Sequence, residues 1–273
     1  MVFHNVWLGP LVLSAYSIFA VLICLLLSYY NNHLPPRWPF LSEIATKSPE
    51  SNVYSLMINH VAVMVAFWVY LKHRELISYF SLEHQVTKRR LLSLFNMCIG
   101  ILGAVAMQMS VNFPKSKIPY IQTYASLILL TCIVIYVWIH TAFSFFVDDP
   151  KIARTKLFIV RACIAAAITS CAGNMIKVFE IRGHNFDKTT PSPLDSQPTG
   201  AIFEWGIYFS VCLFLLTDAY EFRNLSFSAP KLVIPGSESY DETRLLPPTD
   251  ISRNRNMSFN DLPSSQLQAS MVW

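Results

Sequence analysis

The sequence predicts an all-α membrane protein, a polytopic transmembrane six-helix bundle with a disordered cytosolic C-terminal tail. Hydrophobic residues make up 53% of the chain and charged residues only 14%. Six apolar runs each approach the ~20 residues that an α-helix needs to cross about 30 Å of hydrocarbon. Inside a bilayer the backbone groups must be hydrogen-bonded within their own segment, so runs of this length indicate helices rather than buried strands.

The spans are assigned in chain order from these runs. One membrane domain covers residues 1–222, with spans at about 8–30, 53–72, 91–112, 120–142, 157–178 and 200–221. The first run follows an N-terminus without Lys or Arg and precedes no small-residue cleavage site, so we expect a retained anchor rather than a signal peptide. The second run follows Ser48-Pro49, where Ser48 is the expected N-cap and Pro49 lies in the first helical turn.

Small and amide side chains recur every four residues in the third and fifth spans. They are Asn96, Gly100, Ala104, Gln108 and Asn112 in the third span, and Ala162, Ala166, Ser170 and Asn174 in the fifth. Residues four apart share one helix face, and small residues let helix backbones approach closely in a membrane. We therefore predict that both stripes face the bundle interior, and that Ile164 or Ile168 faces lipid or a looser contact.

The distribution of basic residues predicts the orientation. Six spans place both termini on one side, and that side carries fourteen Lys and Arg residues against seven on the other. The positive-inside rule therefore predicts cytosolic termini. Two glycosylation-like triplets, Asn224-Leu225-Ser226 and Asn256-Met257-Ser258, then lie in the cytosol and stay unmodified.

Residues 223–273 form the predicted tail. They include few large apolar residues, so they cannot bury a core and we expect disorder. The segment from Asp241 to Leu246 fits an acidic dileucine sorting motif, with Asp241 four residues before the Leu245-Leu246 pair. Such a motif must be extended and exposed in the cytosol to bind a clathrin adaptor, which a disordered tail allows. We expect it to direct the protein to endosomes and lysosomes.

Several functional classes are disfavoured by what the sequence contains. Each of the six cysteines lies in an apolar run and no pair has metal-ligand spacing, so we expect packing residues and no disulfide framework. The seven histidines are scattered, with no two at ligand spacing on one helix face. No hydrolase motif or phosphate-binding glycine loop occurs, so we expect no catalytic residue, metal or cofactor and no enzymatic activity. The basic residues are dispersed without interleaved aromatic residues, which disfavours nucleic acid and leaves the lipid bilayer as the expected partner.

The loop between the first two runs has a distinctive order of residues. Its defining members are Pro39, Phe40, Leu41, Ser42, Glu43, Thr46, Pro49 and Glu50, followed by Leu56-Met57-Ile58-Asn59. This order resembles the first-loop signature of the damage-regulated autophagy modulator (DRAM) family, which usually reads Pro-Tyr-Ile-Ser-Asp-x-Gly-Thr, then Pro-Glu, then Met-Ile/Leu-Asn. Further similar segments follow in order: Val111-Asn112-Phe113, Arg161, Glu204-Trp205 and Glu221-Phe222. Departures from the family pattern are Glu43 and Glu221 for Asp, and Ala45 for Gly.

The resemblance covers about residues 8–223. It implies a six-span protein of lysosomal and endosomal membranes that promotes autophagy, with no established catalytic activity. Related subfamilies lie in the plasma membrane or the Golgi and act in phosphoinositide or lipid-anchor pathways. An adaptor in one of those pathways is therefore an alternative function, with the plasma membrane or Golgi as the alternative location.

Polar residues inside the predicted spans suggest a pocket on the luminal side. Its candidate members are Asn59, His60, Gln108, Asn112, Asn174, Lys177 and Glu204. In the functional interpretation, Glu204 pairs with Lys177 or His60 and the pocket holds a lipid headgroup or senses acidic pH. The alternative, which we favour, is a packing network that fixes helix register, with Lys177 snorkelling to the surface.

Two further expectations concern residues near the two membrane faces. Near the cytosolic face, we expect Arg161, His140 and Asp218 to be interfacial anchors rather than a proton relay. In the first loop, Trp38, Phe40, Leu41 and Ile44 are placed to pack onto the mouth of the bundle. A third functional hypothesis is a transporter of lipids or small solutes that uses the Glu204 pocket.

Overall fold

The fold was analysed in a computed structural model of the chain. The structure describes residues 2–3, 5–80, 86–113, 119–146, 154–184, 199–224 and 227–228. The chain divides into two units. The larger unit, Phe3–Phe227, contains all the helices described below, and the smaller comprises Met1–Val2 and Ser228–Trp273. Most of the predicted tail, including Asp241, Leu245 and Leu246, lies outside the described residues.

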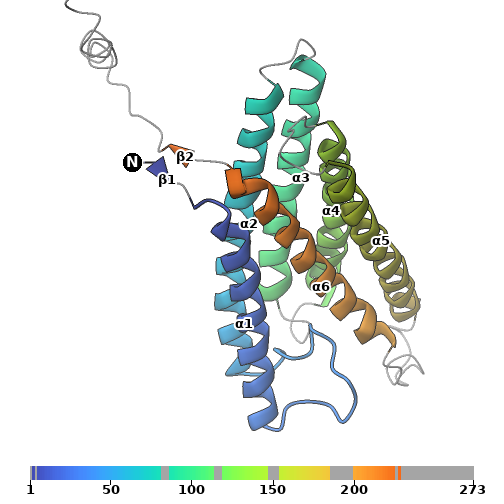
Figure 1. Ribbon diagram of the computed structural model, residues 1–273. Helices are drawn as coiled ribbons and strands as arrows, with labels where there is room; N and C mark the ends of the chain where they lie inside the picture. Colours follow the sequence, from blue (N-terminus) through green and yellow to red (C-terminus); the bar gives the residue numbers. More distant parts are fainter. Residues whose placement is uncertain are drawn as a thin grey trace, which may run out of the picture. The chain divides into compact units, whose positions relative to one another are not determined.

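Six long helices make up the larger unit, as Figure 1 shows. They are α1 (Leu8–Tyr30), α2 (Glu50–Phe80), α3 (Val86–Asn112), α4 (Pro119–Phe146), α5 (Arg154–His184) and α6 (Thr199–Glu221). The remaining elements are a 3-10 turn, η1 (Phe222–Asn224), and two strands of two residues each, β1 (Val2–Phe3) and β2 (Phe227–Ser228). All six helices contain a stretch long and apolar enough to cross a membrane. The predicted all-α, six-span fold is confirmed.

The helices extend beyond the apolar runs that predicted them. The second span was expected at about 53–72, whereas α2 runs from Glu50 to Phe80, and α5 similarly exceeds the expected 157–178. Apolar length marks only the part of a helix that lies in hydrocarbon, whereas the backbone hydrogen bonds continue into polar turns. Part of the charge network described below lies in one of these extensions.

The six helices form a closed ring. Each helix contacts the next one along the chain, and α6 returns to contact α1. The connection at residues 31–49 lies at one end of this ring, which we call the loop end, and α1 begins and α6 ends at the other, which we call the termini end. A ring of six helices leaves space at its centre, and this space is the main feature of the candidate site.

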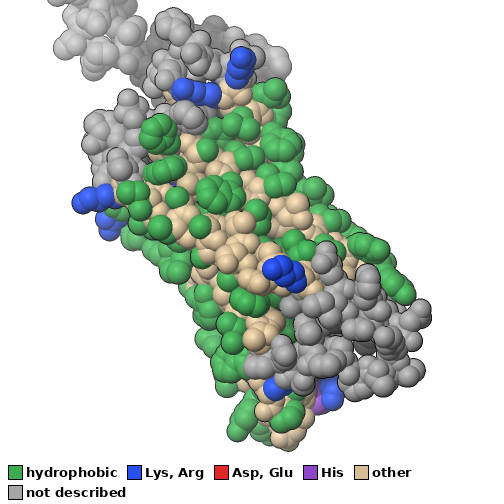
Figure 2. All heavy atoms as spheres, turned by 90° about the vertical axis from the view of Figure 1, so that its right-hand side faces the viewer, with side chains coloured by type: hydrophobic (Ala, Val, Ile, Leu, Met, Phe, Trp, Pro, Cys, Tyr) green, Lys and Arg blue, Asp and Glu red, His purple; other side chains and the backbone are tan. Residues whose placement is uncertain are grey.

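The outer surface of the ring is apolar. Large hydrophobic side chains that are exposed include Leu26, Leu56, Val63, Phe67 and Leu213. Figure 2 shows hydrophobic side chains along most of the length of one face, with no acidic side chain visible on it. An apolar exterior over this length is typical of a surface in contact with lipid.

The small-residue stripe of α3 faces inward along much of its length, as predicted. Asn96 and Ala104 are buried, and Gly100 packs so closely on α2 that an added Cβ would lie 2.7 Å from Val69 Cγ1. Gln108 is half-buried, and Asn112, at the loop end, is exposed.

The prediction for the stripe of α5 is wrong. Ala166 and Ser170 are exposed, whereas Ile168, which was expected to face lipid, is 0% exposed. The buried row contains Arg161, Ala165, Ile168 and Ala172. The physical reason is Arg161, whose guanidinium binds acidic residues of α6 and therefore turns its own face of α5 toward the interior.

Candidate functional site

The connection between α1 and α2 is an ordered cover on the loop end of the bundle, which we call the lid (residues 31–49). Phe40 and Ile44 are 2% and 1% exposed, and Leu41 is half-buried. These three side chains pack as predicted. Trp38 differs, since 59% of it is exposed, although its ring lies 6.0 Å from that of Trp205 in α6.

Glu43 organises the tip of the lid. Arg37 donates from Nη2 to Glu43 Oε1 at 2.8 Å and from Nη1 to Oε2 at 3.1 Å, a bidentate pair with fixed geometry. The Phe40 N–H also donates to Glu43 Oε2 at 3.2 Å, and the Thr46 hydroxyl donates to the Glu43 carbonyl at 3.2 Å. Glu43 and Thr46, two of the family-like loop residues, are thus joined by direct contacts.

Glu50 anchors the other end of the lid. It is fully buried at the first residue of α2, where a carboxylate interacts favourably with the helix dipole. Its side chain contacts His33 Nδ1 and accepts a hydrogen bond from Asn31 Nδ2 at 3.4 Å. The helix begins one residue after Pro49, and its first turn is bonded through Ser51 N to Lys47 O at 2.8 Å.

The lid is bound to α6 through Trp205 and Glu204. Trp205 Nε1 donates to the Pro39 carbonyl at 3.0 Å. The Glu204 carboxylate lies beside the Leu41 and Ser42 backbone and the Ser42 hydroxyl. One of its oxygens, Oε2, is buried without a hydrogen-bond partner in the protein.

Below the lid lies a cavity of about 790 Å³. Its walls include residues of all six helices and of the lid, so it occupies the centre of the ring. Volumes of about 300–1,000 Å³ are typical of sites for small molecules and cofactors. The Ser, Thr, Asn, Gln and Glu residues that line it are Ser17, Ser42, Thr46, Ser48, Ser51, Asn52, Ser55, Ser110, Asn112, Gln122, Thr123, Ser126 and Glu204.

The structure separates the seven predicted pocket residues into two groups. Glu204 and Asn112 line the cavity. Asn59 supports Asn112 from outside the lining through two hydrogen bonds of 3.1 Å, and the Ser55 hydroxyl also donates to Asn112 Oδ1. These contacts hold the loop ends of α2 and α3 together.

The other predicted residues lie elsewhere. His60 shares a hydrogen bond of 3.1 Å with the Tyr16 hydroxyl, and Asn174 donates to Ser170 O of its own helix at 2.9 Å. Lys177 is exposed, and Gln108 does not line the cavity. Within the described chain, Glu204 forms no ion pair with Lys177 or His60. The predicted ion pair rested on the similar depth of these residues in the membrane. In a ring of helices, however, residues at one depth can lie on opposite sides of the ring.

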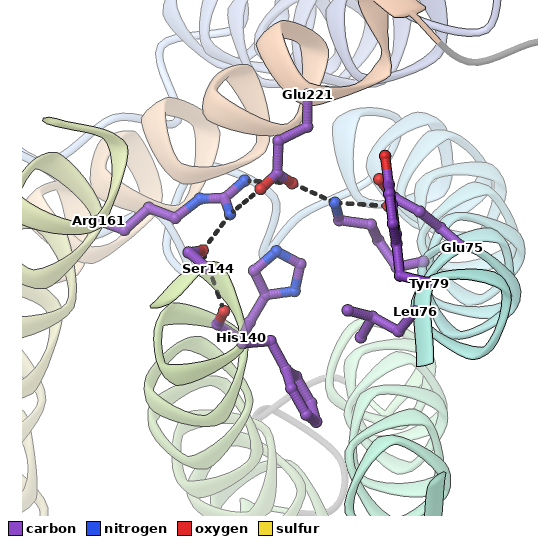
Figure 3. Close-up of a pocket in the computed structure, with 9 residues that line it drawn as sticks. Glu75, Leu76, Tyr79, His140, Ser144, Arg161 and Glu221 are labelled. Carbon is purple, nitrogen blue, oxygen red and sulfur yellow. Dashed lines mark hydrogen bonds and ion pairs between the residues drawn. The ribbon is translucent and has the colours of Figure 1, made fainter. Parts of the chain in front are cut away.

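A second polar cluster lies at the termini end, and we call it the charge network. It consists of Lys72 and Glu75 of α2, His140 of α4, Arg161 of α5, and Asp218 and Glu221 of α6. Figure 3 shows Glu75, His140, Arg161 and Glu221 converging from four helices. The space that these residues line is only about 10 Å³.

Arg161 and Asp218 hold the centre of this network. Arg161 Nη2 lies 2.6 Å from Asp218 Oδ1, and Arg161 Nη1 lies 2.8 Å from Glu221 Oε1. Asp218 also accepts a hydrogen bond from Trp68 Nε1 at 3.0 Å and faces His140 Nε2 at 3.2 Å. Because these groups are buried away from solvent, removing one partner would leave the other charge uncompensated, which is costly.

The expectation that Arg161, His140 and Asp218 are interfacial anchors is therefore wrong. Arg161 is 0% exposed and Asp218 1%, and each is paired inside the bundle. Sequence reasoning also missed Lys72 and Glu75, which lie 2.8 Å apart within the same network. The sequence feature that could have predicted this network is the presence of acidic and basic residues at a similar membrane depth in α2, α5 and α6.

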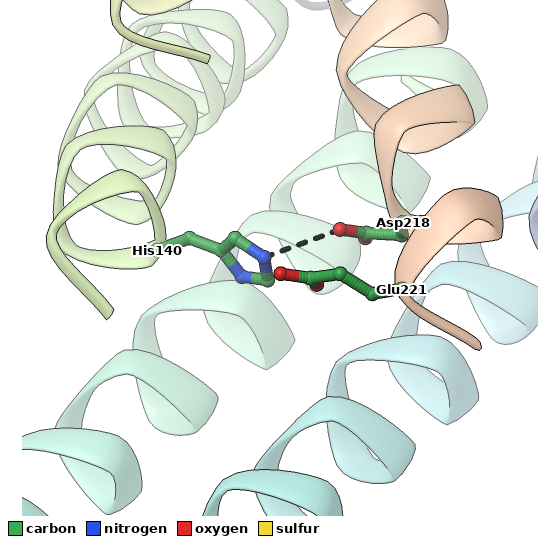
Figure 4. A group of neighbouring side chains, drawn as sticks. All are labelled: His140, Asp218 and Glu221. Atoms are coloured by element: carbon green, nitrogen blue, oxygen red, sulfur yellow. Dashed lines mark ion pairs between the residues drawn. The ribbon is translucent and has the colours of Figure 1, made fainter. Parts of the chain in front are cut away.

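His140, Asp218 and Glu221 lie close enough together to hold a metal ion (Figure 4). Their existing partners argue against that use. Lys72 contacts Glu221, and Arg161 contacts both carboxylates, so two positive charges already lie beside the groups that would bind a metal. Repulsion between cations at this distance is strong in a buried site, and we assign the cluster as an ion-pair network between helices.

Comparison with known proteins gives a consistent family match. The Frag1/DRAM/Sfk1/Cwh43P N-terminal domain matches residues 5–225. DNA damage-regulated autophagy modulator protein 1 of Mus musculus is 23% identical over 224 residues, which cover 80% of this chain and 91% of the relative. DNA damage-regulated autophagy modulator protein 2 of Homo sapiens is 23% identical over 207 residues, covering 71% and 76%. Modulator of macroautophagy TMEM150B-B of Xenopus laevis is 26% identical over 165 residues, covering 59% and 67%. No solved structure matches the chain.

Proposed function

The chain belongs to the Frag1/DRAM/Sfk1/Cwh43P family, and we propose that it is a non-enzymatic regulator of autophagy and lysosome function in the membrane of lysosomes or late endosomes. One observation carries this proposal. The similarity to a protein named as an autophagy modulator extends over 91% of that relative's length and is therefore not confined to a shared fragment.

The geometry of the charge network supports a role without catalysis. His140 is the residue there that would act as a general base, but its Nε2 faces Asp218 behind Arg161. The adjacent space of about 10 Å³ has room for about one water molecule and none for a substrate. The paired side chains instead connect four helices, which fits a role in holding the bundle together.

A lysosomal location is proposed from the dileucine motif in the tail. Replacing Leu245 and Leu246 with Ala should move the protein toward the plasma membrane without lowering its expression, because a tail with so few large apolar residues is expected to bury no core. Imaging of a tagged chain measures this directly. A double variant that stays wholly lysosomal would show that the motif is not the sorting signal, and a wild-type protein at the plasma membrane or Golgi would favour the adaptor alternative.

The role in autophagy is tested by removal and return of the protein. Autophagic flux is measured as the difference in the level of the autophagosome marker LC3 with and without an inhibitor of lysosomal degradation. This flux should be lower in cells that lack the protein, and re-expression of the wild-type chain should restore it. If removal and return both leave this flux unchanged, the proposal is wrong.

The central cavity favours one second candidate, a carrier of lipids or small solutes. Its volume and its enclosure by all six helices are the supporting observations. Reconstitution of the purified protein into vesicles, followed by a measurement of lipid or solute movement between the two leaflets or compartments, separates a carrier from a regulator that only binds.

A further inference from the structure

The central cavity has a polar end and an apolar end. Along α2, Ser51 and Ser55 line it near the lid, and Val61, Val65 and Trp68 line it further along the helix. The same change occurs on other helices. The lining residues of α4 begin with Gln122, Thr123 and Ser126 and continue with Leu129, Ile133 and Val137. A site with this gradient matches an amphiphile whose headgroup lies under the lid and whose chain points toward the termini end.

The charge of the polar end narrows the choice of headgroup. Among the described residues that line the cavity, Glu204 is the only charged one, and neither Lys nor Arg is present. The nearby Arg37 is bound to Glu43 in the bidentate pair of the lid. A phosphate or carboxylate headgroup would therefore meet a negative charge in a poorly screened space without a cation to compensate.

Hydrogen bonding points in the same direction. Glu204 Oε2 and Gln122 Oε1 are both buried, and neither has a hydrogen-bond partner in the protein. Both atoms are acceptors, and leaving a buried acceptor unpaired is costly. An ammonium group brings three donors and a positive charge, so it would neutralise Glu204 and supply donors to an end of the cavity where acceptors are left unpaired. Tyr54 also lines the cavity, and an aromatic ring there is compatible with a bound cation.

We infer that this cavity is a binding site for a long-chain amine, with the ammonium group at Glu204 in the polar end, whose lining also contains Gln122, and the alkyl chain along the apolar walls. This site goes beyond the proposed role in autophagy and does not depend on it, since binding is a property of the purified protein.

The test uses the purified full-length chain in phosphatidylcholine nanodiscs and a diazirine-bearing octadecylamine as the photoaffinity probe. Saturable labelling should fall on peptides that line the cavity. Unlabelled octadecylamine should compete at a concentration about tenfold or more below that of octadecanol or stearic acid, because hydrogen bonds to a charged group are worth more than those to a neutral one.

Three variants locate the site. Glu204→Gln should remove the preference for the amine over the alcohol. Met107→Trp should reduce labelling, because Met107 lines the cavity and a larger side chain fills it, whereas Met109→Trp is the matched control at an exposed position outside the lining. If Glu204→Gln elutes as an aggregate, Gln122→Leu replaces it and should weaken competition by the amine. Equal competition by octadecanol, preferred binding of stearic acid, or unchanged labelling of Met107→Trp would each overturn the inference.

Discussion

Arg161 joins three helices through its guanidinium group alone. It contacts Asp218 and Glu221 of α6, donates from Nε to Thr217 Oγ1 at 2.8 Å, and reaches Ser144 of α4. All these contacts are made by a side chain without solvent exposure. At the scale of single residues, this is the position where a polar group does most to fix helix against helix.

Replacing Arg161 with Ala should destabilise the protein strongly. Asp218 and Glu221 would remain buried with one cation fewer, and breaking a buried pair in this way costs about 3–5 kcal/mol. The thermal unfolding temperature in detergent should fall accordingly. Lys156→Ala is the matched control, because Lys156 is an exposed base in the same helix. An Arg161→Ala protein that unfolds at the wild-type temperature contradicts the assigned role.

The burial of Arg161 could not be predicted from the sequence. A basic residue near the end of a membrane helix usually extends its side chain to the interface, and that general behaviour led to the wrong expectation. Arg161 points inward instead, because two acidic residues, Asp218 and Glu221, lie at the same depth on another helix. Such a pairing depends on which helices are neighbours, and the order of residues along one helix does not contain that information.

At the scale of elements, α3 and α5 show how far a pattern of small residues can be interpreted. Both helices have a row of small side chains, yet only that of α3 lies inside along much of its length. In α5 two rows of small residues run side by side, and Arg161 selects the one that contains Ala165 and Ala172. Small residues permit close contact between helices, but the buried ion pairs of Arg161 determine which face of α5 is turned toward the interior.

Two glycines provide a direct test of the α2–α3 contact. A Cβ at Gly100 would lie 2.7 and 2.8 Å from the two γ carbons of Val69, whereas a Cβ at Gly173 would meet nothing within 4 Å. Gly100→Ala should therefore lower stability by about 1–3 kcal/mol through overpacking. Gly173→Ala should leave it unchanged or raise it by about 0.5–1 kcal/mol, since Ala is the better helix former. Thermal unfolding of the purified variants measures both, and equal effects at the two positions would show that α2 and α3 are not in close contact.

The lid should loosen when its bond to α6 is removed. Trp205→Phe keeps an aromatic ring against Trp38 but removes the hydrogen bond to the Pro39 carbonyl. Because such a bond contributes about 0.5–1.5 kcal/mol net, hydrogen exchange of the amides at residues 37–46 should become about 2- to 10-fold faster. Trp138→Phe is the control, as it removes a hydrogen bond to Thr169 between α4 and α5. Identical lid exchange in the two variants would mean that Trp205 does not hold the lid.

At the scale of the whole molecule, the orientation in the membrane stays a prediction from the basic residues. Asn224 and Asn256 should carry no glycan in cells, because oligosaccharide is transferred only on the luminal side. Asp187→Thr completes a glycosylation triplet at Asn185 on the opposite side and serves as the positive control. A mobility shift after peptide-N-glycosidase treatment should appear for that variant alone, and a glycan on Asn224 or Asn256 would reverse the topology.

The six-helix fold followed from the length of the apolar runs because the bilayer sets that length and enforces helical hydrogen bonding. The lid was anticipated from its apolar residues between prolines. Polar residues of the spans suggested a pocket on the luminal side, but they did not predict most of its lining, because the cavity results from the closure of α6 onto α1, a contact between the two ends of the domain. Glu204 lies in α6 as the sequence indicates, but its neighbours are Leu41 and Ser42 of the lid rather than Lys177.

We expect the polar end of the cavity, with Glu204 as its charged member, to be the functional part of this bundle. The most direct measurement is autophagic flux in cells lacking the protein and re-expressing one variant at a time. Glu204→Gln keeps the size of the side chain and removes its charge, so it should traffic normally and yet fail to restore LC3 turnover. Lys177→Gln, which removes an exposed charge outside the cavity, should restore it fully. Full restoration by Glu204→Gln, together with misfolding of Glu204→Ala, would instead identify a structural hydrogen-bonding residue and contradict the claim.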